Sequence, residues 1–249
     1  MSGGGRDRGR EGRRDDDKVS AGDPAVSSAL DGQALFAVVW RFTFNCNRCN
    51  ALLRAADAMP DLETMGSTLP DDLRRAAVVL SDAALEELLR SLAEIRLPHG
   101  DPKLLEKIPL LADEKAKNPT LAEGNDGRTP CNLARLSLYR DESVEEVIQR
   151  SVIAYLAYKS YNSLKDLADA LDQIGVLRIL KDADGSQLSA MMTRRNHIAH
   201  RADRKEGRGE GDPMSRGIDS ETVRGWIDAV SHFGTKVLDA VLLQPTEEG

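Results

Sequence analysis

The chain has 249 residues, of which 41% are hydrophobic and 4% aromatic, and it carries a net charge of −7 at pH 7. This acidic balance excludes a global basic field that would attract nucleic acid, so any such contact has to come from a local patch. No apolar run is long enough to cross a bilayer, and the N-terminus lacks the apolar core of a signal peptide. The three cysteines are too few for a disulfide scaffold. We therefore expect a cytoplasmic protein with no membrane contact.

Residues 1–24 mix Gly, Arg and Asp, and such a segment cannot bury enough apolar surface to offset its ordering entropy, so we expect a disordered tail. Residues 25–245 are then expected to form one helical domain. Its first helix is predicted from about Ser28 to Ala58, before Pro60. The apolar stripe of this helix consists of Leu35, Val38, Val39, Phe42, Cys46, Cys49, Leu53 and Ala56. Since both cysteines lie on the stripe and no second pair follows, we interpret them as core residues and not as metal ligands.

A second helix is predicted from Pro70 to the residues before Pro98. Its apolar stripe is wide, which favours burial on more than one side, and consists of Leu73, Ala77, Leu80, Ala84, Leu85, Leu88, Leu89, Leu92 and Ile95. Glu86 and Glu87 on this helix are interpreted as solvated carboxylates. The alternative is that they pair with arginines across the bundle.

Residues 98–142 differ from their surroundings, because they combine scattered prolines with the turn-prone segment Gly124-Asn125-Asp126-Gly127. We expect an insertion or lid between core helices, with a short helix at Leu104–Leu111. A third core helix is predicted to begin at the capping box Ser143-Val144-Glu145-Glu146. Its stripe consists of Val144, Val147, Ile148, Val152, Tyr155 and Tyr158.

Three further helices are predicted towards the C-terminus. One follows Ser163 and stops at Gly175, a residue that favours the left-handed turn at a helix end. The next begins near Ser186, and the last runs from about Ser220 to Leu243. Strand-like alternation of useful length is missing from the sequence, so the predicted fold is all-α.

The most informative segment is 191–203, which contains two of the four histidines and a local excess of basic residues. Helical geometry places Arg195 in the middle of an apolar stripe formed by Leu188, Met191, Ile198 and Ala202. A charge in that position is costly unless it is paired or lines a cleft. His200 lies within one turn of Asn196 on the adjoining face, so we expect a groove at the edge of a packed surface.

Arginine, asparagine and histidine suit the cleavage of phosphodiester bonds in RNA. A histidine transfers protons near neutral pH, and an arginine fork matches phosphate oxygens and stabilises charge in the transition state. An asparagine holds either group by hydrogen bonds. With a neighbouring 2′-hydroxyl as nucleophile no metal is required, and no acidic cluster suited to Mg²⁺ lies near the motif, so we expect neither metal nor cofactor.

The run Arg195-Asn196-His197-Ile198-Ala199-His200 resembles the R-N-x-x-x-H signature of HEPN domains, and its continuation through Ala202-Asp203 looks like the RiboL-PSP-HEPN branch. The resemblance covers roughly residues 30–243 apart from 98–142. It implies a HEPN-like antiparallel helical bundle and a metal-independent endoribonuclease, acting as a toxin or phage-defence effector beside an antitoxin or defence-system partner protein. It also implies a homodimer in which two motifs form one RNA-binding cleft, and we expect the motif helix near the two-fold axis.

Carried over residue by residue, the resemblance gives catalytic roles to Arg195 and His200 and a supporting polar role to Asn196. The residues that we expect to bind RNA are Arg194, His197, Arg201 and Arg204. Two alternatives stay open: a non-catalytic HEPN-like interaction module, and a sensor that holds a small phosphate ligand. The intact polar set favours the enzyme, because a scaffold has no need for it in an apolar stripe.

Overall fold

The computed structural model describes residues 24–59, 68–110, 139–182, 185–203 and 215–243. These residues form helices joined by turns, with no β-strand among them, so the all-α prediction is confirmed. None of their helices combines the length and the apolar character that a membrane crossing needs. The predicted tail lies outside the described residues except for Pro24, which begins the first helix, and so does most of the predicted insertion.

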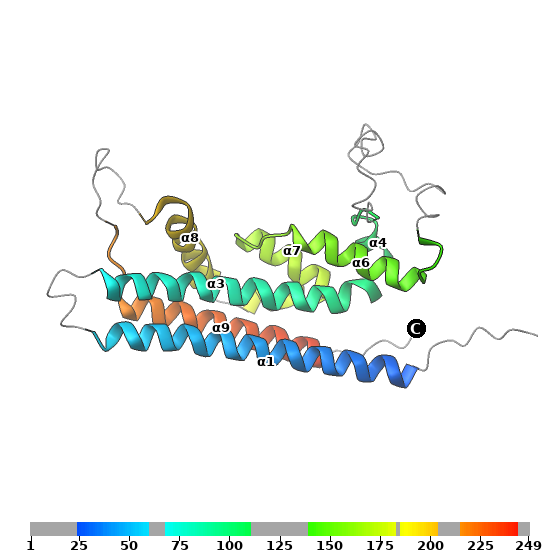
Figure 1. Ribbon diagram of the computed structural model, residues 1–249, viewed down its shortest axis with the longest axis horizontal. Helices are drawn as coiled ribbons and strands as arrows, with labels where there is room; N and C mark the ends of the chain where they lie inside the picture. The colour runs from blue at the N-terminus through cyan, green and yellow to red at the C-terminus, as the bar shows by residue number, and fades with distance from the viewer. Residues whose placement is uncertain (1–23, 60–67, 111–138, 183–184, 204–214, 244–249) are drawn as a thin grey trace, which may run out of the picture.

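Three long helices lie side by side and form the frame of the molecule (Figure 1). They are α1 (Pro24–Asp57), α3 (Leu69–Arg96) and α9 (Ser220–Leu242). Contacts at their ends fix their directions. Arg224 Nη2 of α9 lies 2.8 Å from Asp57 Oδ2 at the end of α1, and Arg96 Nη2 at the end of α3 donates to Val241 O at the end of α9 over 2.8 Å. The helix α1 therefore runs antiparallel to α3 and α9, which run parallel to each other.

The central element is α3, which contacts α1 and α9 on one side and α6 (Val144–Ala157), α7 (Leu164–Ile174) and α8 (Gly185–Arg201) on the other (Figure 1). Its wide apolar stripe is buried accordingly, as predicted. The fully buried leucines of this helix are Leu85, Leu88, Leu89 and Leu92. Because α3 contacts nearly every other long helix, its packing against α8 determines where the motif lies.

Several helix ends follow the predicted capping chemistry. Ser143 and Glu146 form the reciprocal capping box at the start of α6, and the Ser163 side chain accepts the Asp166 amide at the start of α7. Gly175 closes α7 with φ 85°, a conformation that glycine adopts without a side-chain clash. The first helix differs, because α1 begins at Pro24, four residues before the predicted Ser28. Proline is favourable there since its fixed φ suits the first turn of a helix.

Two local predictions need correction, and two short elements were not predicted. The short helix predicted at Leu104–Leu111 is α4 (Pro102–Leu105), which begins at the Asp101 cap and stops well before Pro109. Proline disfavours helical backbone in the residue before it, so Pro109 keeps the helix from extending to Leu111. Tyr158 is not part of the third helical stripe, since α6 ends at Ala157 and Tyr158 is 93% exposed. The short 3₁₀ helices at Leu97–His99 and Leu177–Asp182 were not predicted.

The cysteine pair of α1 is part of the core, as predicted. Cys46 and Cys49 are both buried as free thiols. Burial raises the pKa of each thiol, and hydrogen bonds with Ser231 and Ser81 oppose this shift for Cys46 and Cys49 respectively. The reactive thiolate is therefore disfavoured at both positions, which fits a packing role.

Candidate functional site

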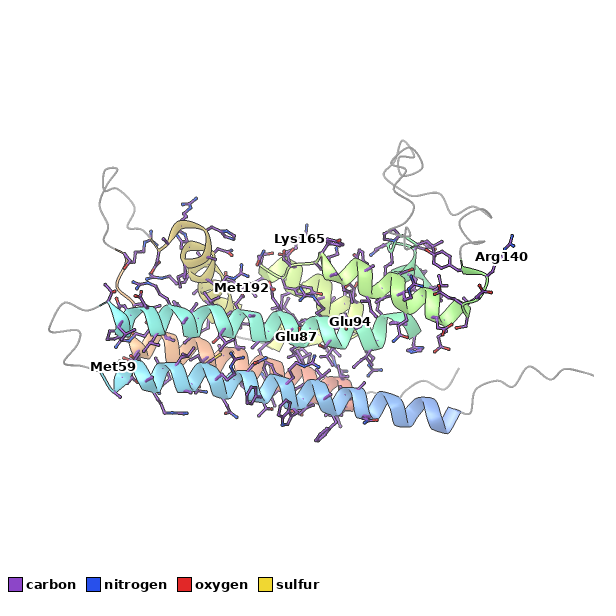
Figure 2. The ribbon with its side chains drawn as sticks, viewed as in Figure 1. Met59, Glu87, Glu94, Arg140, Lys165 and Met192 are labelled. Carbon is purple, nitrogen blue, oxygen red and sulfur yellow. The ribbon has the colours of Figure 1, made fainter. Side chains whose placement is uncertain are left out.

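The motif helix α8 is anchored by apolar side chains near its middle. Leu188, Met191 and Met192 are buried, and Met192 lies where α8 meets α3 (Figure 2). The helix then ends on two left-handed residues, Ala202 with φ 47° and Asp203 with φ 55°. Each non-glycine residue in this region costs roughly 1–2 kcal/mol. Ala202 therefore lies outside the helix and is exposed, which corrects its predicted place on the apolar stripe.

Asp203 is fully buried and offsets this backbone strain through ion pairs. Its Oδ2 lies 2.9 Å from Arg75 Nε of α3 and 2.7 Å from Arg194 Nη2 of α8. Its backbone N–H donates to His197 O over 3.0 Å. Both arginines also donate to the backbone carbonyl of Arg216, at 2.6 Å from Arg75 and 3.1 Å from Arg194. The cluster thus joins the end of α8 to α3 and to the segment that leads into α9.

Arg195 is held by side chains from three elements. Its Nε lies 2.7 Å from Asp82 Oδ2 of α3. Its Nη1 donates to the side-chain oxygens of Asn162, which lies between α6 and α7, and of Asn196, each at 3.1 Å. Its Nη2 lies 4.0 Å from Glu86 Oε1, and its side chain is 20% exposed. The sequence predicted that a charge in this stripe is either paired or lines a cleft. The ion pair of Arg195 with Asp82 confirms the first of these two possibilities.

Asp82 is the buried counter-charge of the motif. Its side chain is 1% exposed, and its contact with Arg195 is ionic, because neither carboxylate oxygen accepts a hydrogen bond from the described residues. Burial raises the pKa of Asp82 to about 6, Arg195 opposes this rise, and Glu86 adds to it. Glu86 is itself only 16% exposed and accepts the Tyr161 amide, so its interpretation as a solvated carboxylate is wrong. Glu87 instead pairs with Arg41.

An open groove of about 340 Å³ lies beside the second half of α8. Its walls carry two imidazoles, two amides and a guanidinium, and the lining residues are Asn162, Asn196, His197, His200 and Arg201. His200 and Arg201 are exposed, while His197 is half-buried. The His197 Nδ1 atom is buried and has no hydrogen-bond partner among the described residues. The groove therefore gathers, on one surface, side chains of the types that can transfer protons and bind phosphate.

A second hollow of about 500 Å³ lies near the start of α9, and His197 borders both. It is lined by Ser186, Ser189, Ala190, Thr193, Arg194, His197, Arg216 and Trp226. Arg194, one of the predicted RNA-binding residues, contributes to this hollow and not to the groove. Its guanidinium forms an ion pair with Asp203 and donates hydrogen bonds to backbone carbonyls, and its side chain is 16% exposed.

The structure thus brings together four of the predicted site residues, Asn196, His197, His200 and Arg201, in one groove. Arg195 lies behind them and holds two of the groove's amides, and Arg204 lies outside the described residues. The sequence interpretation missed two members of the site. Asp82 left a signal, because a carboxylate interrupts the apolar stripe of α3, whereas Asn162 in a loop left none.

Among the described residues, no group of three His, Cys, Asp or Glu side chains is arranged to hold a metal ion. The positive side chains near the motif divide into two classes. Arg194 and Arg195 are balanced by the buried carboxylates of Asp203 and Asp82, while Arg201 is exposed at the groove. No protein-family model, curated protein or solved structure matches the chain.

Proposed function

We propose that the chain is a metal-independent endoribonuclease of the HEPN type, with its active site in the groove beside α8. The observation that carries this proposal is the gathering of two histidines, two asparagine amides and an exposed arginine on one hollow. Its volume of about 340 Å³ is in the range of sites that hold a small ligand. These groups match the needs of phosphodiester cleavage, which are proton transfer and stabilisation of phosphate charge.

In the proposed reaction His200 accepts the proton of an RNA 2′-hydroxyl. The 2′-oxygen then attacks the adjacent phosphorus, and the bond from phosphorus to the 5′-oxygen of the next nucleotide breaks. His197 borders the same groove and donates a proton to the leaving 5′-oxygen. The products are a 2′,3′-cyclic phosphate and a 5′-hydroxyl. An exposed imidazole such as that of His200 suits this role because its ring nitrogens can accept and donate a proton.

The arginines act in different ways in this proposal. Arg201 is exposed in the groove and binds a phosphate oxygen directly. Arg195 holds the amides of Asn162 and Asn196 in place through its Nη1 atom. Its Nη2 atom lies 4.0 Å from Glu86 Oε1, which is an ion-pair distance and not a hydrogen bond. Arg195 is thus a positioning residue that also adds positive charge behind the reacting phosphate.

Single-stranded or looped RNA is the proposed substrate, because its 2′-hydroxyls and unstacked bases reach an open groove more readily than those of a duplex. We place the activity in the cytoplasm and in a toxin or phage-defence setting, with an antitoxin or defence-system protein as a partner. These assignments rest on the resemblance of the Arg195–His200 motif to HEPN domains.

A second function is favoured by one specific observation. The guanidinium of Arg195 is fixed by Asp82, Asn162 and Asn196, so much of its bonding capacity is used within the fold. A module that only binds RNA or a phosphate ligand would also use such a rigid basic groove. This competing function predicts binding without cleavage.

The experiment that separates the two functions is incubation of the purified full chain with RNA in the presence of EDTA. The wild type should cleave RNA and leave an all-DNA strand intact. His200→Ala should lose about 10²- to 10⁴-fold in rate, as is usual when a general acid or base is removed. His232→Ala is the matched control, because His232 is exposed on α9 and does not line the groove. Binding without cleavage by the wild type would replace the enzyme with the interaction module.

A further inference from the structure

An aromatic stripe is exposed on α1. Phe36, Trp40 and Phe44 are spaced one helical turn apart, and they are 71%, 61% and 49% exposed. The rings of Trp40 and Phe44 stack with their centroids 5.3 Å apart. Aromatic residues make up only 4% of the chain, so their concentration on one solvent-facing surface is unusual. Exposed apolar patches of this kind mark interaction sites.

The stripe faces away from the rest of the bundle. The opposite side of α1 carries the buried residues Val38, Phe42, Cys49 and Leu53, which pack in the core. Among the described elements α1 has its main contacts with α3 and α9. In Figure 1 it forms the lower edge of the molecule, while α8 lies on the far side of α3. The stripe is therefore a surface separate from the groove.

The exposed face of α1 is symmetric about Trp40. Counting outward from Trp40, Ala37 and Thr43 occupy one pair of positions, Phe36 and Phe44 the next, and Gln33 and Asn47 the outermost. All of these residues are exposed. Each pair joins like with like: two small side chains, two phenyl rings and two amides. An antiparallel copy of the same helix centred on Trp40 would place every residue opposite its matched partner.

The spacing of this face suits the packing of two helices. Gln33, Trp40 and Asn47 are seven residues apart, and the residues between them fall three and four positions away. This alternation of three and four is the pattern of helices that cross at a shallow angle with interdigitating side chains. The symmetric face contains no charged residue, so its burial leaves no unpaired charge.

The charges beside the face are also compatible with self-pairing. Arg41 would lie close to a two-fold axis at Trp40, but it forms an ion pair of 2.7 Å with Glu87 of α3, whose side chain lies on the α1 side of that helix (Figure 2). Its charge is therefore balanced within each copy. Arg48 sits over the Phe44 ring at 6.0 Å and donates to Asn45. In the antiparallel register it would lie opposite the exposed Gly32 of the second copy, where no positive group opposes it.

We propose that α1 pairs antiparallel with α1 of a second copy of this chain, with the two-fold axis at Trp40. This dimer does not depend on the proposed ribonuclease activity. It directs the two grooves outward, because α8 lies on the opposite side of α3 from the stripe (Figure 1). The homodimer implied by the HEPN resemblance has its motif helices at the axis and stays a separate prediction. Of the described large apolar side chains that are exposed, none lies on α8.

The first test measures the mass of the full chain in solution by light scattering across a micromolar concentration range. The wild type should have at least twice the chain mass of 27.2 kDa. Trp40→Glu should weaken dimerisation by about 30-fold or more, as loss of a central aromatic anchor does. Tyr158→Glu is the matched control, because Tyr158 is 93% exposed on a different surface and should leave the dimer intact. Circular dichroism verifies that each variant stays helical.

The second test determines the direction of the pairing. Phe36→Lys and Phe44→Glu should each weaken the dimer, and the double variant should recover it, because the new charges meet across an antiparallel interface. In a parallel interface like charges would meet and the double variant would be weaker still. A monomeric wild type, which would result if another part of the chain or another protein covers the stripe, overturns the proposal. So does a Trp40→Glu variant whose mass equals that of the wild type at every concentration, or a double variant without recovery.

Discussion

The guanidinium of Arg195 and the carboxylate of Asp82 meet 2.7 Å apart behind the groove, and they join α8 to α3. Each charge interrupts an apolar stripe of its own helix, so each would be costly in the core without the other. Removal of one partner of such a pair leaves a buried charge uncompensated. Through Arg195 the pair also fixes the amides of Asn162 and Asn196, and it therefore determines the shape of the groove.

Asp82→Asn should change the dependence of stability on pH. The pKa of Asp82 is raised from 3.8 to about 6, so its favourable contribution is complete below pH 4 and is lost as the pH rises through 6. Asparagine does not titrate. The free energy of unfolding of Asp82→Asn, relative to wild type, should therefore increase by about 2 kcal/mol between pH 4 and pH 7. Urea unfolding at several pH values measures this difference, and a difference that does not vary with pH would contradict the burial of an ionised Asp82.

Arg201→Ala should weaken RNA binding without abolishing cleavage at saturation. Arg201 is exposed at the groove, and a single phosphate contact contributes mainly through the release of counterions. The slope of log affinity against log salt should become shallower by about 0.7 for a single strand. Filter binding at several salt concentrations gives the slope. An unchanged slope would mean that Arg201 does not touch the RNA backbone.

Substitutions at the end of α8 should have opposite effects on stability. Asp203→Ala leaves Arg75 and Arg194 without their buried counter-ion and should cost about 3–5 kcal/mol. Ala202→Gly relieves a left-handed residue with φ 47° and should stabilise the protein by up to about 1 kcal/mol. Thermal unfolding compares the two variants. If Asp203→Ala unfolds at the wild-type temperature, the ion cluster does not anchor the end of α8.

Two glycines of α9 form a matched pair for testing the packing of α1 on α9. A Cβ atom on Gly234 would overlap the ring of Phe42, so Gly234→Ala should destabilise the protein by about 1–3 kcal/mol. A Cβ atom on Gly225 would have no neighbouring atom within 4 Å. Gly225→Ala should therefore gain helix propensity, up to about 1 kcal/mol. Equal effects of the two substitutions in urea unfolding would contradict the close approach of Phe42.

Much of the helical frame could be predicted from the sequence, because the signals are local. The apolar spacing of the long helices and the caps at Ser143, Ser163 and Gly175 depend on neighbouring residues only. The short α4 and the exposure of Tyr158 were predicted less well, because apolar spacing alone does not show where a helix stops.

The candidate site was predictable where one helix carries it. Asn196, His197, His200 and Arg201 lie within two turns of α8, so helical geometry places them together. The partners from elsewhere could not be assigned in this way. Asp82 pairs with Arg195 across more than a hundred residues of sequence, and Arg194 was expected at RNA but is bound to Asp203. Such pairings depend on how the helices pack, which a spacing pattern in one helix does not contain.

The chemical ends of the RNA products test the proposed activity most directly. The wild-type chain is incubated with a short single-stranded RNA in EDTA, and the fragments are identified by mass spectrometry. Attack by the 2′-hydroxyl predicts 2′,3′-cyclic phosphate or 3′-phosphate ends together with 5′-hydroxyl ends, and His200→Ala should give none above background. Fragments with 5′-phosphate and 3′-hydroxyl ends, or fragments formed equally by His200→Ala, would contradict the assignment of the groove beside α8 as a metal-independent ribonuclease site.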